Sequence, residues 1–509
     1  MHRPVMDKST HLASAHLHRC VFWVKIAKTD YYCGIAMTTT PAMLDELLLQ
    51  QQQYFAKHPI PSAAERRHSL DLLKSALLKY QDALIQAINQ DYGNRSLTES
   101  KIGELLTCIE QIKYYQKHLS RWMRPSKRRI GILHQPASGY VSYEPYGVIG
   151  IITPWNYPLV LSMGPLICAL AAGNVAMVKL SGASMHFGKV LKSALSEVFL
   201  PSQVAVVYGD DISEHFGKLP FDKLIFTGSS AVGRIVMQQA AANLTPVLLE
   251  LGGKSPAIVH ESMPMADAAE RLAFGKLWNA GQTCVAPDHL YLPRGKLDEF
   301  IDCYQKQVAK MYPTLAKNPD YTSIIHARQY DKLQQLLTDA AAKGATIIHI
   351  NPANDSDEML KDIRKIPPTI VHGVSDEMLI MQQEIFGPIL PIIEYDDIDQ
   401  VIHTINQGDR PLALYYFDYN KQRGDYIRQW THSGHFGQNG VVTHVAQDDL
   451  PFGGVGASGM GKYHGPEGFY SFSHARSVMI TPKIFGLRLI LPPFASKFAL
   501  TWIERLFLR

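Results

Sequence analysis

The chain has 509 residues, of which 46% are hydrophobic and 19% charged, and its formal net charge is +4. One hydrophobic core rarely grows beyond about 300 residues, so this length predicts two or three domains. The small net charge excludes a general affinity for polyanions, and the densest basic run, residues 121–129, lacks the aromatic and zinc-ligand spacing of nucleic-acid sites. We therefore expect no nucleic-acid partner.

The six cysteines form no CxxC pair and show no short repeating spacing. Neither a disulfide framework nor a metal site is expected, and a reducing, cytoplasmic location is the default. Residues 1–40 form an expected N-terminal extension without clear periodicity, and their apolar run 21–24 stops at Lys25 without a signal-peptide cleavage site. Because Met37 precedes a new amphipathic pattern, we interpret it as a candidate start of the natural chain.

The segment from Leu44 to about Tyr115 spaces its apolar residues at helical intervals, which predicts a helical lead-in. Residues 130–133 and 140–143 are interpreted as the two strands of a hairpin outside the main pattern. Such a hairpin is suited to an arm that pairs with another subunit.

Between residues 147 and 251, short apolar runs alternate with helical stretches. This pattern predicts an α/β fold with a parallel sheet covered on both faces, and right-handed crossovers make the sheet doubly wound. Ligands of such sheets bind beyond the carboxyl ends of the strands. Residues 250–472 repeat the pattern and predict a second α/β domain. The expected strands include residues 147–152, 175–179, 204–207, 224–226, 247–249, 346–350 and 389–393.

A turn containing Gly228 and Gly233 follows one expected strand and opens a helix, a position that suits a bound phosphate group. Arg234 and Ile235 stand where a P-loop has Lys and then Ser or Thr, and no GxGxxG motif is present. A nucleoside triphosphatase is therefore disfavoured, and a plain helix cap is the alternative.

Asn156 lies between Pro154 and Pro158, directly after the first core strand. The prolines stiffen this turn, and a side-chain amide held there can donate a hydrogen bond to a developing oxyanion. An ordinary Asx turn is the alternative interpretation.

Cys284 ends the small-residue turn Gly-Gln-Thr-Cys, thirty-four positions after Glu250. A thiolate can attack an electrophilic carbon, and a carboxylate can activate the water that releases the covalent intermediate. This pairing favours nucleophilic catalysis. The alternatives are a small buried cysteine and a surface carboxylate.

Three further segments are candidates for a functional or a structural role. Lys179 ends an apolar strand and could reach a ribose or phosphate, or it could simply extend its ammonium group to water. Glu384 and Phe386 are a candidate ribose ligand and ring wall, or part of an ordinary Gly-Pro turn. The glycine-rich residues 450–461 are typical of close backbone packing.

In this order and at these separations, the segments resemble the aldehyde dehydrogenase superfamily over roughly residues 41–482. The most specific pieces are residues 250–256 (ELGGKSP), 281–284 (GQTC), 384–388 (EIFGP) and 450–456 (LPFGGVG). Residues 244–246 and 458–465 are similar to the class 3 branch and to bacterial coniferyl aldehyde dehydrogenases.

The resemblance implies five parts of the chain and a homodimer. They are an N-terminal extension (1–40), a dinucleotide-binding domain (41–122 and 142–249), a catalytic domain (250–472), a small β oligomerisation arm (123–141 and 473–482) and a C-terminal amphipathic tail (483–509). The tail mixes aromatic and aliphatic residues with cations, which is typical of a helix at a membrane surface. Capping of a hydrophobic groove on the protein itself is the alternative.

The resemblance also implies oxidation of an aldehyde to a carboxylic acid through a thioester on the cysteine, with hydride passing to NAD or NADP. The implied catalytic residues are Cys284, Glu250 and Asn156. The implied cofactor-binding residues are Thr153, Pro154, Trp155, Lys179, Gly228, Ser229, Ser230, Ala231, Val232, Gly233, Leu251, Gly252, Glu384 and Phe386. The implied substrate residues are Tyr157, Val445 and Ala446, which suit an aromatic or medium-chain aldehyde, coniferyl aldehyde among them.

One position departs from the family pattern. A glutamate commonly stands three residues after the lysine and holds the adenosine ribose, whereas this chain has Gly182 there. A carboxylate at that position repels the 2′-phosphate of NADP, so its absence opens the site to both cofactors. A coenzyme A-acylating dehydrogenase and a non-catalytic binding or structural protein on the same fold are the alternative functions.

Overall fold

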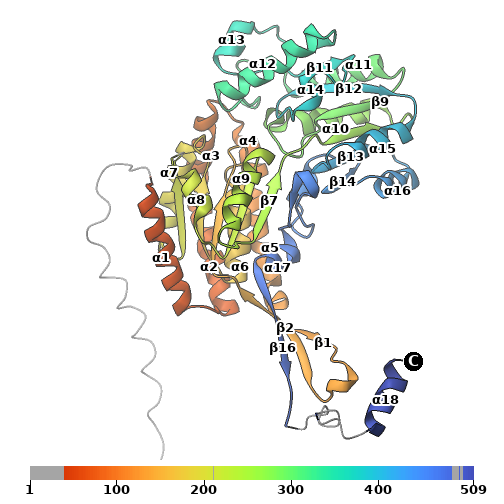
Figure 1. Ribbon diagram of the computed structural model, residues 1–509. Coiled ribbons are helices and arrows are strands. Elements are labelled where there is room, and N and C mark those ends of the chain that lie inside the picture. The colour runs from red at the N-terminus through yellow and green to blue at the C-terminus, as the bar shows by residue number, and fades with distance from the viewer. Residues whose placement is uncertain (1–38, 210, 484–491, 493–496, 509) are drawn as a thin grey trace, which may run out of the picture. The chain divides into compact units, whose positions relative to one another are not determined.

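The computed structural model (Figure 1) describes residues 39–209, 211–483, 492 and 497–508. The expected N-terminal extension therefore lies almost wholly outside the described residues. The helical lead-in is confirmed, and its second helix begins with a capping box in which Ser62 and Glu65 satisfy each other's backbone N–H groups. Its elements are α1 (Pro41–Lys57), α2 (Ala63–Lys79), α3 (Gln81–Tyr92), α4 (Leu97–Ser100), a π-helical turn (Lys101–Leu106) and α5 (Thr107–Trp122).

The first large sheet has the strand order β15-β7-β6-β3-β4-β5, and all strands except the short edge strand β15 are parallel. The five predicted strands of this part are confirmed. They are β3 (Val148–Ile152), β4 (Val175–Leu180), β5 (Val204–Tyr208), β6 (Lys223–Gly228) and β7 (Val247–Leu251). The helices between them are α6 (Val160–Ala172), α7 (Met185–Ser196), α8 (Ser213–Lys218) and α9 (Ser230–Ala241).

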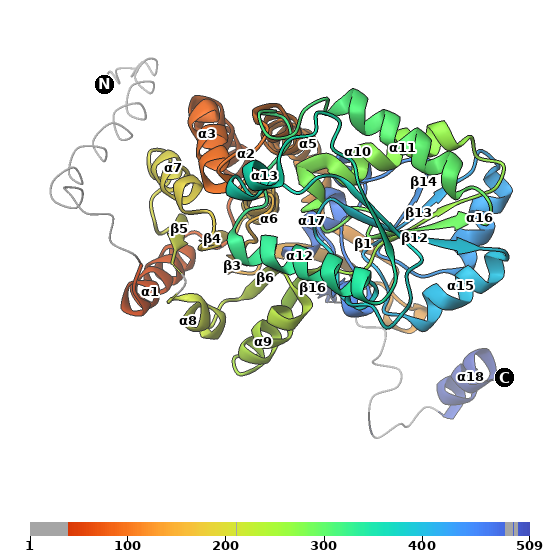
Figure 2. The same cartoon turned by 90° about the horizontal axis from the view of Figure 1, so that it is seen from above.

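Alternate residues of these strands enter two different cores. In β3, Ile149 and Ile151 pack with α6 and α7, whereas Val148 and Ile152 pack with α1, α8 and α9. Figure 2 shows α6 and α7 on one face of the sheet and α1, α8 and α9 on the other. The predicted doubly wound arrangement is therefore confirmed, and it explains why the strands are apolar on both faces.

The second large sheet has the order β10-β11-β12-β9-β8-β13-β14 and is parallel except for β10. Its strands are β8 (Pro256–Val259), β9 (His289–Pro293), β10 (Thr346–His349), β11 (Thr369–His372), β12 (Ile389–Tyr395), β13 (Ala413–Phe417) and β14 (His435–Gln438). Its helices are α10 (Met265–Leu277), α11 (Leu297–Met311), α12 (Ala327–Ala342), α13 (Asp357–Asp362), α14 (Leu379–Gln382), α15 (Ile398–Gln407) and α16 (Lys421–Trp430). The two strands predicted in this part correspond to β10 and β12.

The chain then returns to the first sheet through the glycine-rich segment. Strand β15 (Gly459–Met460) pairs with β7, and α17 (Gly465–Ser471) packs on α6. A Cβ atom on Gly459 would collide with the carbonyl oxygen of Leu249, so glycine is required for this backbone approach. The sequence interpretation of close backbone packing is confirmed.

A third, small sheet forms the arm, with the order β1-β2-β16. Its strands are β1 (Ser126–Arg128), β2 (Ser138–Pro145) and β16 (Ser473–Ile480). The hairpin exists, but its predicted first strand is wrong. Because Ser126 pairs with Val141 and Arg128 with Gly139, residues 129–137 form the connection. Ile130 lies in this connection, and its side chain covers Gly139.

The tail contains α18 (Lys497–Phe507), which agrees with the helix expected there, while Phe494 lies outside the described residues. Phe498, Trp502 and Leu508 are exposed. In the part of the chain that the structure describes, no helix combines the length and the apolar character needed to span a bilayer.

Candidate active site

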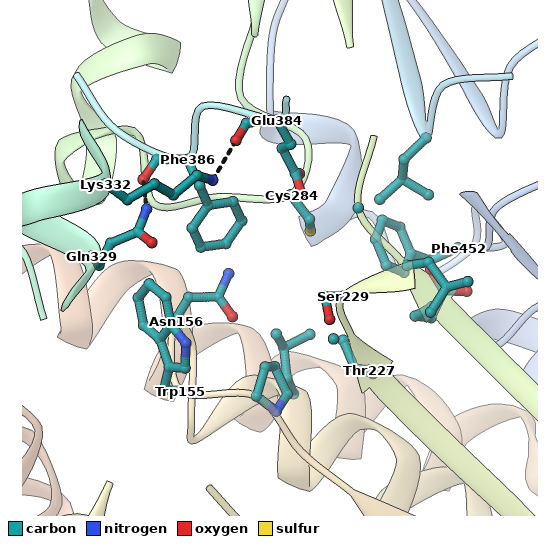
Figure 3. Close-up of a pocket in the computed structure, with 17 residues that line it drawn as sticks. Trp155, Asn156, Thr227, Ser229, Cys284, Gln329, Lys332, Glu384, Phe386 and Phe452 are labelled. Carbon is teal, nitrogen blue, oxygen red and sulfur yellow. Dashed lines mark hydrogen bonds between the residues drawn. The ribbon is translucent and has the colours of Figure 1, made fainter. Parts of the chain in front are cut away.

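The site lies where the order of the first sheet reverses, between β3 and β6. The turn that follows β3 carries Asn156, and the turn that follows β6 carries Ser229. Neighbouring strands that lead into crossovers in opposite directions leave a crevice at their carboxyl ends. A cavity of about 220 Å³ occupies it (Figure 3), lined by Pro154, Trp155, Asn156, Leu161, Thr227, Gly228, Ser229, Glu250, Leu251, Gly252, Cys284, Gln329, Lys332, Glu384, Phe386, Leu412 and Phe452.

Cys284 reaches this cavity from a loop with an unusual backbone. Asn279, Ala280 and Gly281 have φ angles of 52°, 50° and 72°, all in the left-handed region. A Cβ atom on Gly281 would collide with the carbonyl oxygen of Gly387, so this position requires glycine. The Gln282 side chain fixes the loop: its Nε2 donates to the Asn279 carbonyl (3.0 Å) and its Oε1 accepts from the Ile325 N–H (3.0 Å).

Asn156 is buried beside the same loop. Its Nδ2 donates to the Gln282 carbonyl over 3.2 Å, which holds the amide near Cys284. An amide nitrogen carries two protons, so a second donor remains for an oxygen in the cavity. The structure thus brings the predicted oxyanion donor and the predicted nucleophile together, although they are 128 positions apart in the sequence.

Glu250 lies on β7 and is only 2% exposed. Neither of its carboxyl oxygens has a hydrogen-bond partner among the described residues. Burial raises the pKa of this carboxyl well above its ordinary value of 4.5. The Gly454 N–H and the Lys462 charge favour the ionised form to a smaller extent, and an ionised carboxylate at this position can take a proton from a water molecule in the cavity.

The thiol of Cys284 is also held in its neutral form. Burial raises its pKa to about 12, and the negative charges of Glu384 and Glu250 add to the shift. Because the thiolate is the reactive form, attack requires the thiol proton to leave toward a base in the cavity.

The turn at the start of α9 has the features predicted for a phosphate site. Ser229 caps the helix by accepting the Val232 N–H, and Ser229 and Ala231 are exposed at this end. A Cβ atom would come within 2.6 Å of Phe226 at Gly228 and within 2.6 Å of Leu251 at Gly233, so both glycines permit close packing of helix and strand. The positive end of a helix there suits a pyrophosphate group.

Glu384 and Phe386 line the opposite wall. Glu384 Oε1 accepts the Gly253 N–H (3.2 Å), and a side chain at Gly252 would collide with the Glu384 carboxylate. Burial raises the pKa of Glu384 to about 7. The Phe386 ring meets Trp155 edge to face, with ring centroids 5.4 Å apart. The sequence reasoning missed Gln329 and Lys332 of α12, which donate to the backbone carbonyls of Phe386 and Glu384.

Six of the predicted cofactor residues do not line this cavity: Thr153, Lys179, Ser230, Ala231, Val232 and Gly233. The last four belong to the first turns of α9. Lys179 is buried at the end of β4, and its carbonyl accepts the Thr153 N–H and hydroxyl at 3.0 and 3.3 Å. Lys179 and Thr153 therefore hold the turn that carries Trp155 and Asn156 against the end of β4.

Cys284 also borders a second, more apolar cavity of about 310 Å³. Of the predicted substrate residues, Tyr157, Val445 and Ala446 all line it. The sequence reasoning missed the aromatic rings of Phe274 and Trp278, because α10 gives no motif that distinguishes them from core residues. Cys284 thus borders both cavities, of which the second has the more apolar lining.

Comparison with known proteins agrees with this geometry. Residues 29–478 match the model of the aldehyde dehydrogenase family. The chain is 48% identical over 454 residues to a probable coniferyl aldehyde dehydrogenase of Pseudomonas aeruginosa, covering 89% of this chain and 94% of that protein. It is 45% identical to the coniferyl aldehyde dehydrogenase of Pseudomonas sp. (82% and 87% covered) and 36% identical to mouse aldehyde dehydrogenase family 3 member A2 (86% and 88%).

Solved structures show the same fold. A substrate-bound AldH of Staphylococcus aureus superposes with a TM-score of 0.85 at 35% identity, covering 91% of this chain and 99% of that one. A Mycobacterium tuberculosis aldehyde dehydrogenase complexed with NAD+ superposes with a TM-score of 0.78 at 28% identity (88% and 92% covered). The chain belongs to the aldehyde dehydrogenase family and is an enzyme that oxidises aldehydes with NAD(P).

Proposed function

We propose that the chain oxidises aromatic or medium-chain aldehydes, coniferyl aldehyde among them, to carboxylic acids. The observation that carries this proposal is the apolar cavity of about 310 Å³ that ends at Cys284. Phe274, Trp278 and Tyr157 give it aromatic walls, which suit a flat ring better than a short polar aldehyde. The names of the two Pseudomonas relatives support the same substrate class.

In the proposed mechanism, the Cys284 thiol gives its proton to a water molecule in the cavity and Sγ adds to the carbonyl carbon. The carbonyl oxygen becomes an oxyanion that accepts a hydrogen bond from Asn156 Nδ2. The C–H bond then breaks with its electron pair and leaves a thioester on Cys284. When bound, the nicotinamide supplies the acceptor for that hydride. Glu250 takes a proton from water, the water oxygen adds to the thioester carbon, and the C–S bond breaks to release the acid.

Water rather than coenzyme A is the proposed acceptor of the acyl group. Glu250 supports this choice, because a buried carboxyl with a raised pKa and no partner among the described residues is suited to activating water. An acyl transfer to a thiol would not need such a base.

The proposed cofactor contacts come from two opposite walls of the cavity of about 220 Å³. The first turn of α9, residues 228–233, would hold the pyrophosphate, and Glu384 would hold a ribose beside Phe386. Leu251 and Gly252 would border the nicotinamide, and Lys179 would act near the adenosine ribose. Gly182 leaves room for the 2′-phosphate of NADP, so both cofactors are proposed to bind.

The proposed domain boundaries remain those given by the sequence, with residues 459–471 packing against the dinucleotide-binding part. A homodimer through the arm is supported by β16, the outer strand of the small sheet, on which Met479 and Ile480 are exposed. The cytoplasmic location is proposed from the cysteine pattern alone. Peripheral membrane contact is supported by α18, whose exposed Phe498 and Trp502 lie close in sequence to Lys497 and Arg505.

A turnover panel tests the substrate proposal. Nicotinamide reduction is measured with acetaldehyde, hexanal, benzaldehyde and coniferyl aldehyde. We expect kcat/KM to be higher for the larger aldehydes than for acetaldehyde. Trp278→Ala should lower kcat/KM for the aromatic aldehydes more than for acetaldehyde. A preference for acetaldehyde in both proteins contradicts the proposal, and product formation that requires coenzyme A favours the acylating alternative.

A further inference from the structure

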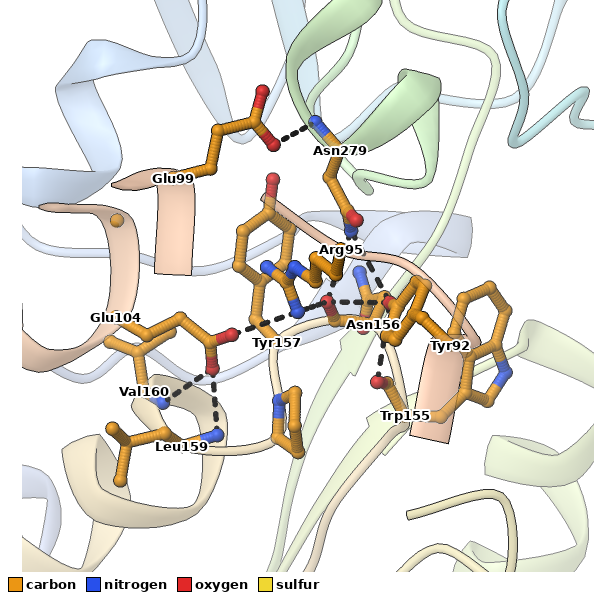
Figure 4. Close-up of polar contacts among 12 residues, drawn as sticks. Tyr92, Arg95, Glu99, Glu104, Trp155, Asn156, Tyr157, Leu159, Val160 and Asn279 are labelled. Atoms are coloured by element: carbon orange, nitrogen blue, oxygen red, sulfur yellow. Dashed lines mark hydrogen bonds and ion pairs between the residues drawn. The ribbon is translucent and has the colours of Figure 1, made fainter. Parts of the chain in front are cut away.

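Asn156 stands out because its backbone carbonyl accepts three side-chain hydrogen bonds in a fully buried position. Arg95 Nη1 donates over 2.9 Å, the Tyr92 hydroxyl over 3.0 Å and Asn279 Nδ2 over 3.0 Å. Figure 4 shows these three donors converging on one oxygen. A carbonyl has two lone pairs, so three donors fix the direction of this peptide group strongly.

The Arg95 donor is itself part of an ion pair without access to water. Arg95 Nη1 lies 2.8 Å from Glu104 Oε1, and both side chains are 0% exposed. The guanidinium also lies over the rings of Tyr92 (5.1 Å to the centroid) and Tyr157 (4.8 Å). A buried ion pair contributes little net stability compared with apolar packing, so its contacts are better explained by a role in holding one specific arrangement.

Glu104 extends this arrangement to the far side of the same turn. Its Oε2 accepts the N–H groups of Leu159 (2.7 Å) and Val160 (3.3 Å). Helix α6 starts there with Leu159 as its N-cap residue, and Leu159 cannot accept a capping hydrogen bond with its side chain. The Glu104 carboxylate therefore caps α6 in place of the missing N-cap side chain. Its negative charge is attracted to the positive N-terminal end of that helix.

The turn that carries Asn156 is thus held from both ends by one charge pair. Arg95 fixes the peptide carbonyl of Asn156 itself, and Glu104 fixes the chain three and four residues later. Glu104 comes from the π-helical turn, whose Ile102 and Gly103 line the apolar cavity. π-helical turns are frequent at functional sites because they redirect side chains.

We infer that Arg95 and Glu104 are positioning residues of the reaction: they hold the Asn156 amide in the orientation that stabilises the oxyanion. This inference rests on the proposed role of Asn156. Neither residue lines the cavities at Cys284, so both act through the turn that they hold. A displacement of a catalytic group by about 1 Å costs on the order of a hundredfold in rate, which is the scale expected here.

A double-mutant cycle in the full-length enzyme tests this inference. Arg95→Lys keeps the charge opposite Glu104 but removes the planar guanidinium. We expect it to lower kcat on benzaldehyde by about tenfold to a hundredfold, with KM nearly unchanged, because the lost interaction acts in the transition state. In an Asn156→Ala background the same substitution should change kcat by less than about twofold, since the group it positions is gone.

Two further variants separate positioning from general damage. Arg66→Lys is the matched control: Arg66 is also buried and donates to main-chain carbonyls, but those belong to Pro61 and Ala171, so kcat should stay within about twofold in both backgrounds. Tyr92→Phe removes one donor to the Asn156 carbonyl while keeping the ring, and its smaller loss of kcat should also vanish in the Asn156→Ala background.

Equal losses of kcat in both backgrounds, or no loss of kcat in the parent, overturn the inference. Where Arg95→Lys does not fold, Tyr92→Phe decides by the same comparison. If Asn156→Ala alone leaves kcat unchanged, the proposed oxyanion role itself fails, which is a distinct result. NAD affinity, measured by quenching of protein fluorescence, should stay within about twofold for Arg95→Lys, because Arg95 does not line the cofactor cavity.

Discussion

The hydroxyl groups of Tyr157 and Thr283 lie 2.7 Å apart and share a buried hydrogen bond. Tyr157 directly follows Asn156, and Thr283 directly precedes Cys284. This bond therefore joins the turn after β3 to the loop that presents the nucleophile. Together with the bond from Asn156 Nδ2 to the Gln282 carbonyl, it fixes the relative position of two catalytic candidates that come from different parts of the chain.

Replacing the nucleophile should stop the chemistry without removing the cofactor site. Cys284→Ser is expected to lower aldehyde oxidation by at least about a thousandfold, because an alcohol is a far weaker nucleophile at neutral pH. NAD binding, followed by fluorescence quenching, should persist. Cys303→Ser is the control, since Cys303 is also partly exposed but lies on α11 away from both cavities. Turnover of Cys284→Ser within tenfold of the parent means that another group is the nucleophile.

Replacing the base should separate the two half-reactions. Glu250→Gln is expected to give a burst of reduced cofactor close to one equivalent per site, followed by a steady rate lower by about 10² to 10⁴, because in the proposed mechanism water takes the Cys284 proton and Glu250 acts only in deacylation. Stopped-flow absorbance of reduced nicotinamide measures both phases. Glu270→Gln on the exposed face of α10 should behave like the parent. A lost burst would place Glu250 in the first half-reaction instead.

Cofactor selectivity should depend on a missing carboxylate. Gly182→Glu is expected to raise the ratio of kcat/KM for NAD over NADP, because the new carboxylate repels the 2′-phosphate. Gly182→Gln is the matched control, with the same size and no charge, and should shift the ratio much less. Initial rates with both cofactors measure the effect, and a parent enzyme that does not turn over with NADP contradicts the prediction.

Glu384 should make stability depend on pH in the cofactor-free enzyme. Burial raises its pKa from 4.5 to about 7, so between these values the folded state binds more protons than the unfolded state. Its contribution is therefore fully present below pH 4.5 and is lost as pH rises through 7. The midpoint of urea unfolding is measured from pH 4.5 to above pH 7. Glu384→Gln should make this midpoint depend less on pH than it does in the parent enzyme. An unchanged slope shows that Glu384 is ionised throughout.

The C-terminal tail should affect membrane contact and leave catalysis intact. Truncation after residue 493 removes α18 with its exposed Phe498 and Trp502, and the exposed Leu508 that follows it. We expect the full-length protein, but not the truncated one, to sediment with anionic vesicles at low salt, because apolar burial and cation attraction act together. Turnover of small aldehydes should not change. Neutral vesicles are the control, and loss of the oligomer on truncation favours the groove-capping alternative.

Local patterns in the sequence were enough to predict much of this protein. The apolar runs of β3 to β7 are continuous because both faces of the sheet are covered, so their positions and parallel direction followed from the pattern, whereas their order in the sheet did not. Cys284, Glu250 and Asn156 could be proposed because each lies in a short motif with a chemical meaning. The first strand of the arm was misplaced, since the register with β2 and not the apolar character of residues 130–133 decides which residues pair.

Only the tertiary structure decided which distant side chains support these motifs. Gln329, Phe274 and Trp278 lie on ordinary amphipathic or mixed segments and become part of a cavity wall only when the two sheets pack together. Arg95 and Glu104 carry no motif, and a sequence reader would place such charges at the surface. The fold buries both and joins them to Asn156, because contacts between residues far apart in the chain depend on three-dimensional packing that local sequence patterns do not encode.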